Sequence, residues 1–303
     1  MAPGIKDFKT YEEQVDLLIA RGMDVGDRGK AIAQLERVNY YRLSGYWYPF
    51  RQLTPSGKRT DDFYPGASLD DVVVLYDFDA RLRTAVFDAL TPVELALRAA
   101  IGHALGEVHE CAHLHPQHLS SRAQGDSYQR WIDSYYEELD RSREDFVGHH
   151  KKKYGGTLPV WAAVEILDWG SLTYLFNFSS SAVQSQVADA VGLSSPQLHS
   201  WMKCLNLVRN TCAHHGRLFN RAHVLTPKLP QPRQCSELDL VRHVMNRTFG
   251  QLSLIQYLRT QYGIQPSRML SAVIRSYPTQ VGRVPVSHVG VPEGWEGSPL
   301  WGS

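Results

Sequence analysis

The sequence has few cysteines and no long hydrophobic run, and both absences restrict what the protein can be. Only four of the 303 residues are cysteine, and none has the CxxC spacing typical of redox or zinc motifs. No stretch approaches the roughly 18 uninterrupted apolar residues of a membrane-spanning helix, and the first residues lack the apolar core of a secretory signal. We therefore expect a cytoplasmic protein with reduced thiols and no membrane partner.

An excess of charge of one sign is also lacking. The chain has 32 lysine and arginine residues against 31 aspartate and glutamate residues, which gives a formal net charge of +1. This balance argues against a protein that is basic over its whole surface, but it leaves room for a local basic cleft. Hydrophobic residues make up 43% of the chain, an ordinary globular composition that excludes wholesale disorder.

The alternation of polar and apolar residues that marks half-buried strands is missing as well. Apolar residues recur instead at helical spacing almost everywhere, so the sequence predicts an all-α fold. Ser68 is expected to cap a long helix. Thr91, Pro92 and Glu94 have the pattern of a capping box, which predicts that another helix begins there. Residues 51–67 contain two prolines and two glycines and are expected to form a loop.

The segment RNTCAHHGRLFNR, residues 209–221, gathers three arginines and two adjacent histidines. Its first half continues a helix that we expect to be capped by Ser195. The apolar positions of this helix fall within about 60° of Leu205 and so predict a buried stripe. They are Leu198, Trp201, Met202, Leu205, Val208 and Cys212. Arg209 lies about 40° from the centre of the stripe, so it must be paired or face a cleft, and Glu94 is one possible partner.

A polar row on the same helix leads to one of the histidines. Asn206, Asn210 and His214 follow each other at intervals of four residues and should therefore stack along one face. Asn210 could then hydrogen-bond the His214 ring and hold its orientation. Gly216 is expected to end the helix as its C-terminal cap, which places His214 in the last turn.

The segment 209–221 closely resembles the signature of abortive-infection proteins of the AbiD/AbiF type, which belong to the HEPN superfamily of helical, ribonuclease-like proteins. The resemblance continues, in the order of that family, at NYYRLSGYWYPF (39–50), LYDFDARLRTAVFDALTPVELALR (75–98) and LPVWAAVEILDWGSLTYLF (158–176). It covers roughly residues 30–225.

The resemblance implies a fold, an arrangement of the chain and a set of functional residues. The fold would be a HEPN-type helical bundle over residues 1–275, with additional N-terminal helices in residues 1–60. The resemblance does not extend to residues 276–303, whose Gly-, Pro- and Val-rich composition predicts a tail that either packs on the body or stays mobile. The Arg-polar-x3-His element of metal-independent RNases maps onto Arg209, Asn210 and His214. The residues that follow it are candidates for binding RNA, namely His215, Arg217, Asn220 and Arg221. Glu94 and Arg98, spaced at i and i+4, are further candidates that could touch RNA or orient Arg209, although a purely structural pair is favoured.

The chemistry of RNA cleavage fits these residue types. RNA carries its own nucleophile, the 2′-OH, so cleavage to a 2′,3′-cyclic phosphate needs a proton acceptor, a proton donor and charge stabilisation. A histidine can perform either proton step, and an arginine can hold the phosphate oxygens with its planar fork. No cofactor or metal is expected. Because the chain offers one such element, a homodimer with a composite site is the expected assembly.

Two other functions remain open at this stage. The same pocket could bind a regulatory or guide-like non-coding RNA without cutting it, or the protein could be a defence sensor that contacts only other proteins. An antitoxin or a non-coding RNA could control the activity.

Three weaker signals have ordinary structural explanations. The His-rich segment 109–118 could ligate zinc, but Pro116 and the single cysteine favour a solvated loop. The basic run HHKKKY, residues 149–154, could contact an RNA backbone, but a solvated helix end is favoured. The aromatic residues of 39–50 could stack on bases, although core packing is the favoured interpretation.

Overall fold

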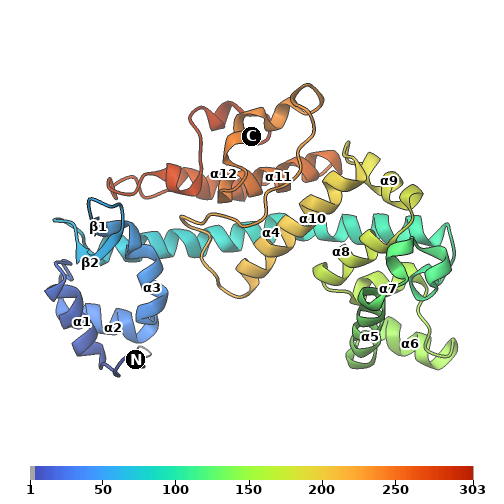
Figure 1. Cartoon of the computed structure of the whole chain (residues 1–303), viewed down its shortest axis with the longest axis horizontal. Helices are drawn as coiled ribbons and strands as arrows, with labels where there is room; N and C mark the ends of the chain where they lie inside the picture. Colours follow the sequence, from blue (N-terminus) through green and yellow to red (C-terminus); the bar gives the residue numbers. More distant parts are fainter. Residues whose placement is uncertain (1–3, 303) are drawn as a thin grey trace.

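The structure is a computed structural model that describes residues 4–302. It is predominantly helical, as the sequence predicts, and its helices surround one long central helix, α4 (Figure 1). The α-helices are α1 Tyr11–Ala20, α2 Arg28–Arg37, α3 Tyr40–Trp47, α4 Leu69–Gly106, α5 Asp126–Arg141, α6 Asp145–Lys153, α7 Val160–Ile166, α8 Trp169–Phe178, α9 Ser181–Asp189, α10 Ser195–Ala213, α11 Thr248–Gln261 and α12 Arg268–Arg275. Short 3-10 helices connect several of them, the longest being Ser236–Val244.

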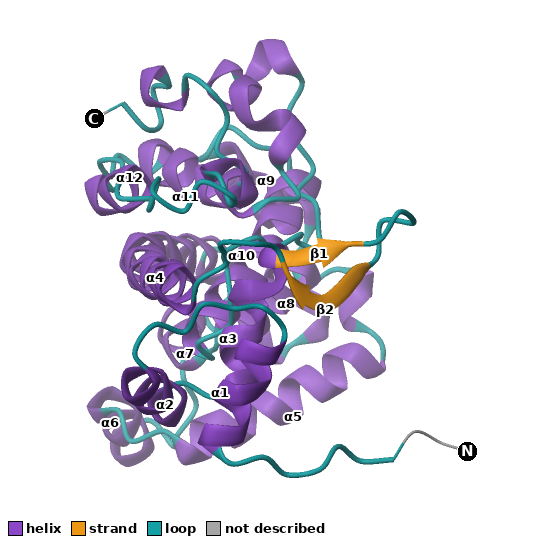
Figure 2. Ribbon diagram, turned by 90° about the vertical axis from the view of Figure 1, so that its left-hand side faces the viewer, coloured by secondary structure: helices purple, strands orange, loops and turns teal. Residues whose placement is uncertain are grey.

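The segment expected to be a loop between α3 and α4 contains a small hairpin. Its strands are β1 Arg51–Leu53 and β2 Arg59–Phe63, which pair antiparallel (Figure 2). The turn is closed by a hydrogen bond from the Thr54 amide to the Lys58 carbonyl at 2.8 Å, and Gly57 supplies the positive φ of 78° that the turn needs. The strands are too short for a pattern of alternating residues to become visible in the sequence.

Helix α4 runs without a break from Leu69 to Gly106, so the prediction that a new helix begins at Thr91 is wrong. Ser68 caps α4 as predicted, since its side chain accepts a hydrogen bond from the Asp71 amide at 3.1 Å. The Thr91 hydroxyl does not cap anything; it donates to the Phe87 carbonyl one turn earlier, at 2.9 Å. Pro92 therefore lies inside a helix that tertiary contacts hold together.

The neighbours of α4 explain why the helix continues through a proline. Helices α3, α7, α9, α10, α11 and α12 all contact it. Arg259 of α11 donates a hydrogen bond to the Ala89 carbonyl at 2.9 Å, close to the point where Pro92 removes an amide donor. Local sequence preference is overruled here because the buried face of α4 continues on both sides of the proline.

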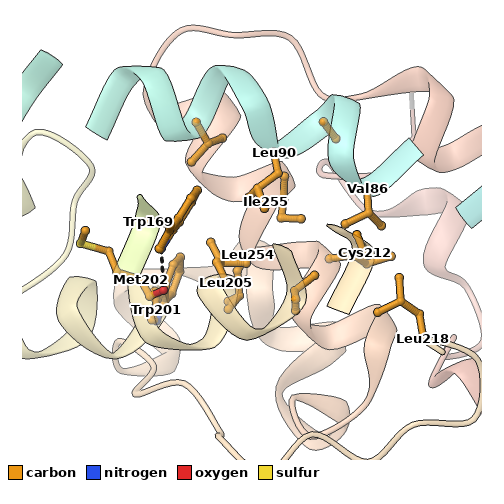
Figure 3. Close-up of a cluster of buried hydrophobic side chains, with 14 of the residues drawn as sticks. Val86, Leu90, Trp169, Trp201, Met202, Leu205, Cys212, Leu218, Leu254 and Ile255 are labelled. Carbon is orange, nitrogen blue, oxygen red and sulfur yellow. Dashed lines mark hydrogen bonds between the residues drawn. The ribbon is translucent and has the colours of Figure 1, made fainter. Parts of the chain in front are cut away.

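The core is formed where α4, α8, α10 and α11 meet (Figure 3). Leu90 of α4, Leu205 of α10 and Ile255 of α11 are fully or almost fully buried and lie together there. The indole of Trp169 in α8 donates to the Met202 carbonyl of α10 at 2.8 Å, which ties the two helices by a polar bond inside the apolar core.

The segment after residue 275 packs against the helical body. Trp301 is completely buried, stacks on Phe249 of α11 with ring centroids 4.3 Å apart, and donates from its indole to the Ser253 hydroxyl at 3.0 Å. Of the two alternatives for this segment, packing and mobility, the structure has packing. Among the described helices, none is both long enough and apolar enough to cross a membrane.

Candidate functional site

Helix α10 carries the first half of the segment 209–221, and its packing fixes the direction in which that segment leaves the core. The helix begins at Ser195, and its N-cap is Ser194, one residue earlier than predicted, whose amide donates to the Gln197 side-chain oxygen at 2.8 Å. The predicted apolar stripe is buried from Leu198 to Cys212. Because the stripe packs on α4 and α11, the last turn of α10 is held firmly.

The end of α10 differs from the prediction by one residue. His214 is the C-cap, and His215, not Gly216, takes the left-handed conformation, with a φ of 53°. The Gly216 amide donates to the Thr211 carbonyl at 2.7 Å, and the His215 amide donates to the Cys212 carbonyl at 3.1 Å, which is the pairing of a Schellman motif. Both histidine side chains are exposed. A histidine in this conformation is uncommon and requires support from its surroundings.

The predicted row of polar residues on α10 is formed in part. The side-chain amide of Asn210 donates from Nδ2 to the Asn206 side-chain oxygen at 3.2 Å, as the spacing predicts. Asn210 meets His214 only through the main chain, where the His214 amide donates to the Asn210 carbonyl at 3.0 Å. The expected bond from Asn210 to the imidazole is not formed within the described residues. The backbone of His214 is no longer helical, with φ −94° and ψ 18°, so its side chain does not continue the row.

Arg209 pairs with Glu94, the partner that the sequence suggested. The two side chains are 3.9 Å apart from Nε to Oε2, and the Arg209 guanidinium also lies over the Phe87 ring, 5.7 Å from its centroid. Glu94 is shared with Arg98, whose Nη2 lies 2.5 Å from Oε1. The Arg98 side chain is 10% exposed and donates to the Val164 carbonyl, whereas the Arg209 side chain is 30% exposed. Arg98 therefore holds Glu94 from the inside, and Arg209 faces outward.

The residues after the histidines are joined to helix α3. Arg42 of α3 donates to the His215 carbonyl at 2.5 Å, and Arg217 donates to the Gly45 carbonyl of the same helix. Burial lowers the pKa of the Arg217 guanidinium. Arg221, half-buried, donates to the Arg217 carbonyl at 3.3 Å. Of these cations Arg42 is the exposed one, and Arg217 is used mainly to attach the segment to α3.

A buried carboxylate orders the chain beyond Arg217. Asp79 of α4 accepts hydrogen bonds from the amides of Leu218 and Phe219, the latter at 2.7 Å. It is also 2.6 Å from an Arg83 guanidinium nitrogen and 2.6 Å from the Tyr46 hydroxyl oxygen. Asn220, a predicted RNA-binding residue, follows this pair of amides in a left-handed conformation with φ 47°.

Sequence reasoning missed Asp79, Arg83, Tyr46 and Arg42. The spacing of Asp79 and Arg83 at i and i+4, inside a segment with apolar residues on the same side, was a visible sign of a buried pair. Nothing in the sequence indicated that α3, about 170 residues earlier in the chain, would lie against the segment 209–221.

The His-rich segment forms a cluster of rings and one isolated buried histidine. The rings of His109 and His118 stack with centroids 4.5 Å apart, and His115 lies 5.4 Å from His109. Within the described residues, no group of three or more His, Cys, Asp or Glu side chains is placed to hold a metal ion. His113 is completely buried, and burial lowers its pKa to about 3.

The other two weaker signals are the basic run 149–154 and the aromatic segment 39–50. The basic run 149–154 covers the last turn of α6 and the residue after it, where Lys152 and Lys153 are exposed. The aromatic segment 39–50 forms α3 and the turn after it. Core packing accounts for Tyr46, Trp47 and Phe50, half of its six aromatic residues, whereas Tyr41 and Tyr48 are exposed.

Fold and site together define a helical protein with an Arg-Asn-x3-His element at an exposed helix end. The model of the family described as Abi-like protein matches residues 33–220 of the chain, so the protein belongs to that family. The matched part extends from α2 to Asn220 and includes α3, α4 and the whole of α10. No curated protein and no solved structure shows a significant match. The resemblance to abortive-infection proteins is confirmed at this level, while the HEPN superfamily and the AbiD/AbiF type stay predictions.

Proposed function

We propose that this Abi-like protein is a metal-independent RNA endonuclease of the HEPN type that acts in abortive infection. The observation that carries the proposal is the end of α10. There an exposed imidazole, His214, follows Arg209 by five residues, and the Arg209 side chain is 30% exposed although its Nε is buried on the side of Glu94. The Glu94 contact at 3.9 Å holds the arginine loosely, which leaves donors for a phosphate.

In the proposed reaction the 2′-oxygen of RNA attacks the neighbouring phosphorus. A bond from phosphorus to the 2′-oxygen forms and the bond to the 5′-oxygen breaks, which leaves a 2′,3′-cyclic phosphate and a 5′-OH. The proton lost by the 2′-OH goes to a base, and an acid gives a proton to the 5′-oxygen. His214 performs one of these steps, Arg209 stabilises the charge on the phosphate oxygens, and Asn210 holds Arg209 through its side-chain oxygen at 3.5 Å.

The reaction needs two proton-transfer groups on opposite sides of the phosphate, which supports a homodimer. His215 adopts a left-handed backbone and follows His214 directly, so it is poorly placed to oppose it. A two-fold axis would bring two copies of His214 to one RNA. Exposed apolar side chains on the two helices that carry Glu94 and Arg209 are available for such an interface. They are Phe87, Leu95 and Leu207, with exposed fractions of 42%, 54% and 41%.

The second candidate is an RNA-binding module that does not cut. It is favoured by the use of Arg98 and Arg217 for internal contacts, which leaves few cations at the site of one chain free for catalysis. An antitoxin or a regulatory RNA would be a further partner in either case.

Purified protein incubated with labelled RNA in EDTA tests the proposal. We expect cleavage that leaves 2′,3′-cyclic phosphate ends, and loss of cleavage by about 100-fold or more in Arg209→Ala and His214→Ala. His103→Ala, which removes another exposed histidine, is the matched control and should cleave like the wild type. Products with 5′-phosphate ends, or activity that needs Mg²⁺, would contradict the mechanism. RNA binding without cleavage by the wild type would favour the second candidate.

A further inference from the structure

The carboxylate of Asp79 lies at the meeting point of three segments that are distant in sequence. Tyr46 approaches it from α3, Arg83 from the next turn of α4, and the amides of Leu218 and Phe219 from the chain after the histidines. Asp79 is completely buried. A buried carboxylate is costly unless it is fully hydrogen-bonded, so its donors are held in place as firmly as it is.

The donors divide between the two oxygens of the carboxylate. The Phe219 amide donates to Oδ1, at 2.7 Å, whereas Tyr46 and Arg83 donate to Oδ2. The Tyr46 ring also stacks on the Phe219 ring, with centroids 5.9 Å apart and planes 14° from parallel. The position of Phe219 is therefore fixed twice, once through its amide and once through its ring.

The effect of this network reaches the end of α10 through a short connection. Leu218 is four residues after His214, and the chain between them makes the left-handed turn at His215. Arg42 and Arg217 hold the same turn from the side of α3, the former through the His215 carbonyl. An uncommon backbone conformation persists only where its surroundings enforce it, and these contacts are the surroundings of His215.

We propose that Asp79 is the positioning residue of the site at the end of α10, because it fixes Leu218 and Phe219 and thereby the His214–His215 turn. The inference rests on the proposed function for its consequence in catalysis, but not for its consequence in structure. Burial raises the pKa of the Asp79 carboxyl, while the Tyr46 hydroxyl, the Arg83 guanidinium and the two amides act in the opposite direction.

The test compares Asp79→Asn and Tyr46→Phe with the wild type. Asn keeps the shape and one acceptor oxygen, but its NH₂ group would face the donors of Tyr46 and Arg83, so the network must rearrange. Tyr46→Phe removes one donor and leaves the stacked ring. Ser253→Ala, which removes a buried hydrogen bond to Trp301, is a control for loss of stability outside the network. All variants are studied at a temperature at which thermal melting shows them folded.

The first readout is hydrogen exchange of the backbone amides, which needs no RNA. In Asp79→Asn we expect exchange to speed up about 10-fold or more for residues 215–219, with little change in residues 198–208 of α10, and a smaller effect in Tyr46→Phe. Unchanged exchange in residues 215–219, or an equal increase along the whole chain, would overturn the positioning role. Ser253→Ala should leave residues 215–219 protected.

The second readout is RNA cleavage. Misplacement of the imidazole by about 1 Å should lower kcat about 100-fold, with KM changed much less. An Asp79→Asn protein with faster exchange and wild-type kcat would overturn the link to the site. If the wild type itself does not cleave RNA, the proposed function fails, and the exchange measurement still decides whether Asp79 positions the turn.

Discussion

At the scale of single residues, burial separates the histidines of this protein into two kinds. His214 and His215 are exposed at the end of α10. His113 is completely buried against the Tyr135 ring, 5.1 Å from its centroid, and neither ring nitrogen has a hydrogen-bond partner within the described residues. His113 is thus kept neutral by its surroundings and makes the fold sensitive to acid.

The sensitivity to acid can be measured with His113→Phe. The pKa of His113 in the folded protein is about 3, below its ordinary value, so protonation favours the unfolded chain. The folded protein is therefore fully stable with respect to this group at neutral pH and loses stability as the pH falls below about 6.5. The loss of unfolding free energy due to His113 reaches about 2 kcal/mol at pH 5. We expect urea unfolding to show a smaller loss of stability between pH 7 and pH 5 in His113→Phe than in the wild type. Equal losses would show that His113 does not titrate as described.

At the scale of elements, Glu94 of α4 takes part in a mostly buried ion pair within its own helix and in a partly exposed one with α10. Glu94 is held at 2.5 Å by Arg98, which is mostly buried, and at 3.9 Å by Arg209, which faces outward. Removal of the carboxylate therefore leaves a buried guanidinium without its counter-charge, whereas removal of Arg209 leaves the inner pair intact.

Glu94→Ala and Arg209→Ala should separate these two roles. We expect Glu94→Ala to lower the free energy of unfolding by about 3 kcal/mol, because the Arg98 charge becomes uncompensated. Arg209→Ala should cost about 1 kcal/mol or less, as expected for a partly exposed pair at long distance, while cleavage is lost. Urea unfolding and the RNA assay measure the two effects. A larger destabilisation in Arg209→Ala than in Glu94→Ala would contradict this division.

At the scale of the whole molecule, the C-terminal segment closes the core beside α11. Trp301, close to the end of the described chain, is as deeply buried as the tryptophans of α8 and α10. Trp301→Ala should therefore lower the free energy of unfolding by about 3–5 kcal/mol. Trp161→Ala, at a position that is 50% exposed, should cost less than about half of that. Similar melting temperatures for the wild type and Trp301→Ala would show that the segment does not contribute to the core.

The assembly is tested by mixing subunits. An excess of His214→Ala protein is added to the wild type under conditions that allow subunit exchange. If both histidines of a dimer are needed, mixed dimers are inactive, and activity falls faster than the fraction of wild-type protein. Ser253→Ala protein added in the same excess controls for dilution. A strictly proportional loss, or full activity from a demonstrated monomer, would contradict a shared site.

The sequence by itself determined the helical class, the buried stripe of α10 and the candidate pair of Arg209 and Glu94. The helical class and the stripe depend on the periodicity of apolar residues, which acts within adjacent turns of a helix. For the pair, the cost of burying a charge showed that Arg209 needs a partner or a cleft, and Glu94 was one possible partner, whose contact from another helix the structure confirms. The family assignment over residues 33–220 likewise depends on local motifs. Such signals survive in the sequence because they do not require knowledge of distant neighbours.

Only the tertiary structure decided whether α4 continues through Pro92, which histidine turns left-handed, and what holds that turn. A helix can pass through a proline when partners on several sides bury its faces, and the sequence near Thr91 contains nothing about those partners. The contacts of Arg42 with His215 and of Asp79 with Phe219 join residues that are 173 and 140 positions apart. A pairing over such a distance is set by the packing of α3 and α10 on α4, and no local pattern in the sequence specifies it.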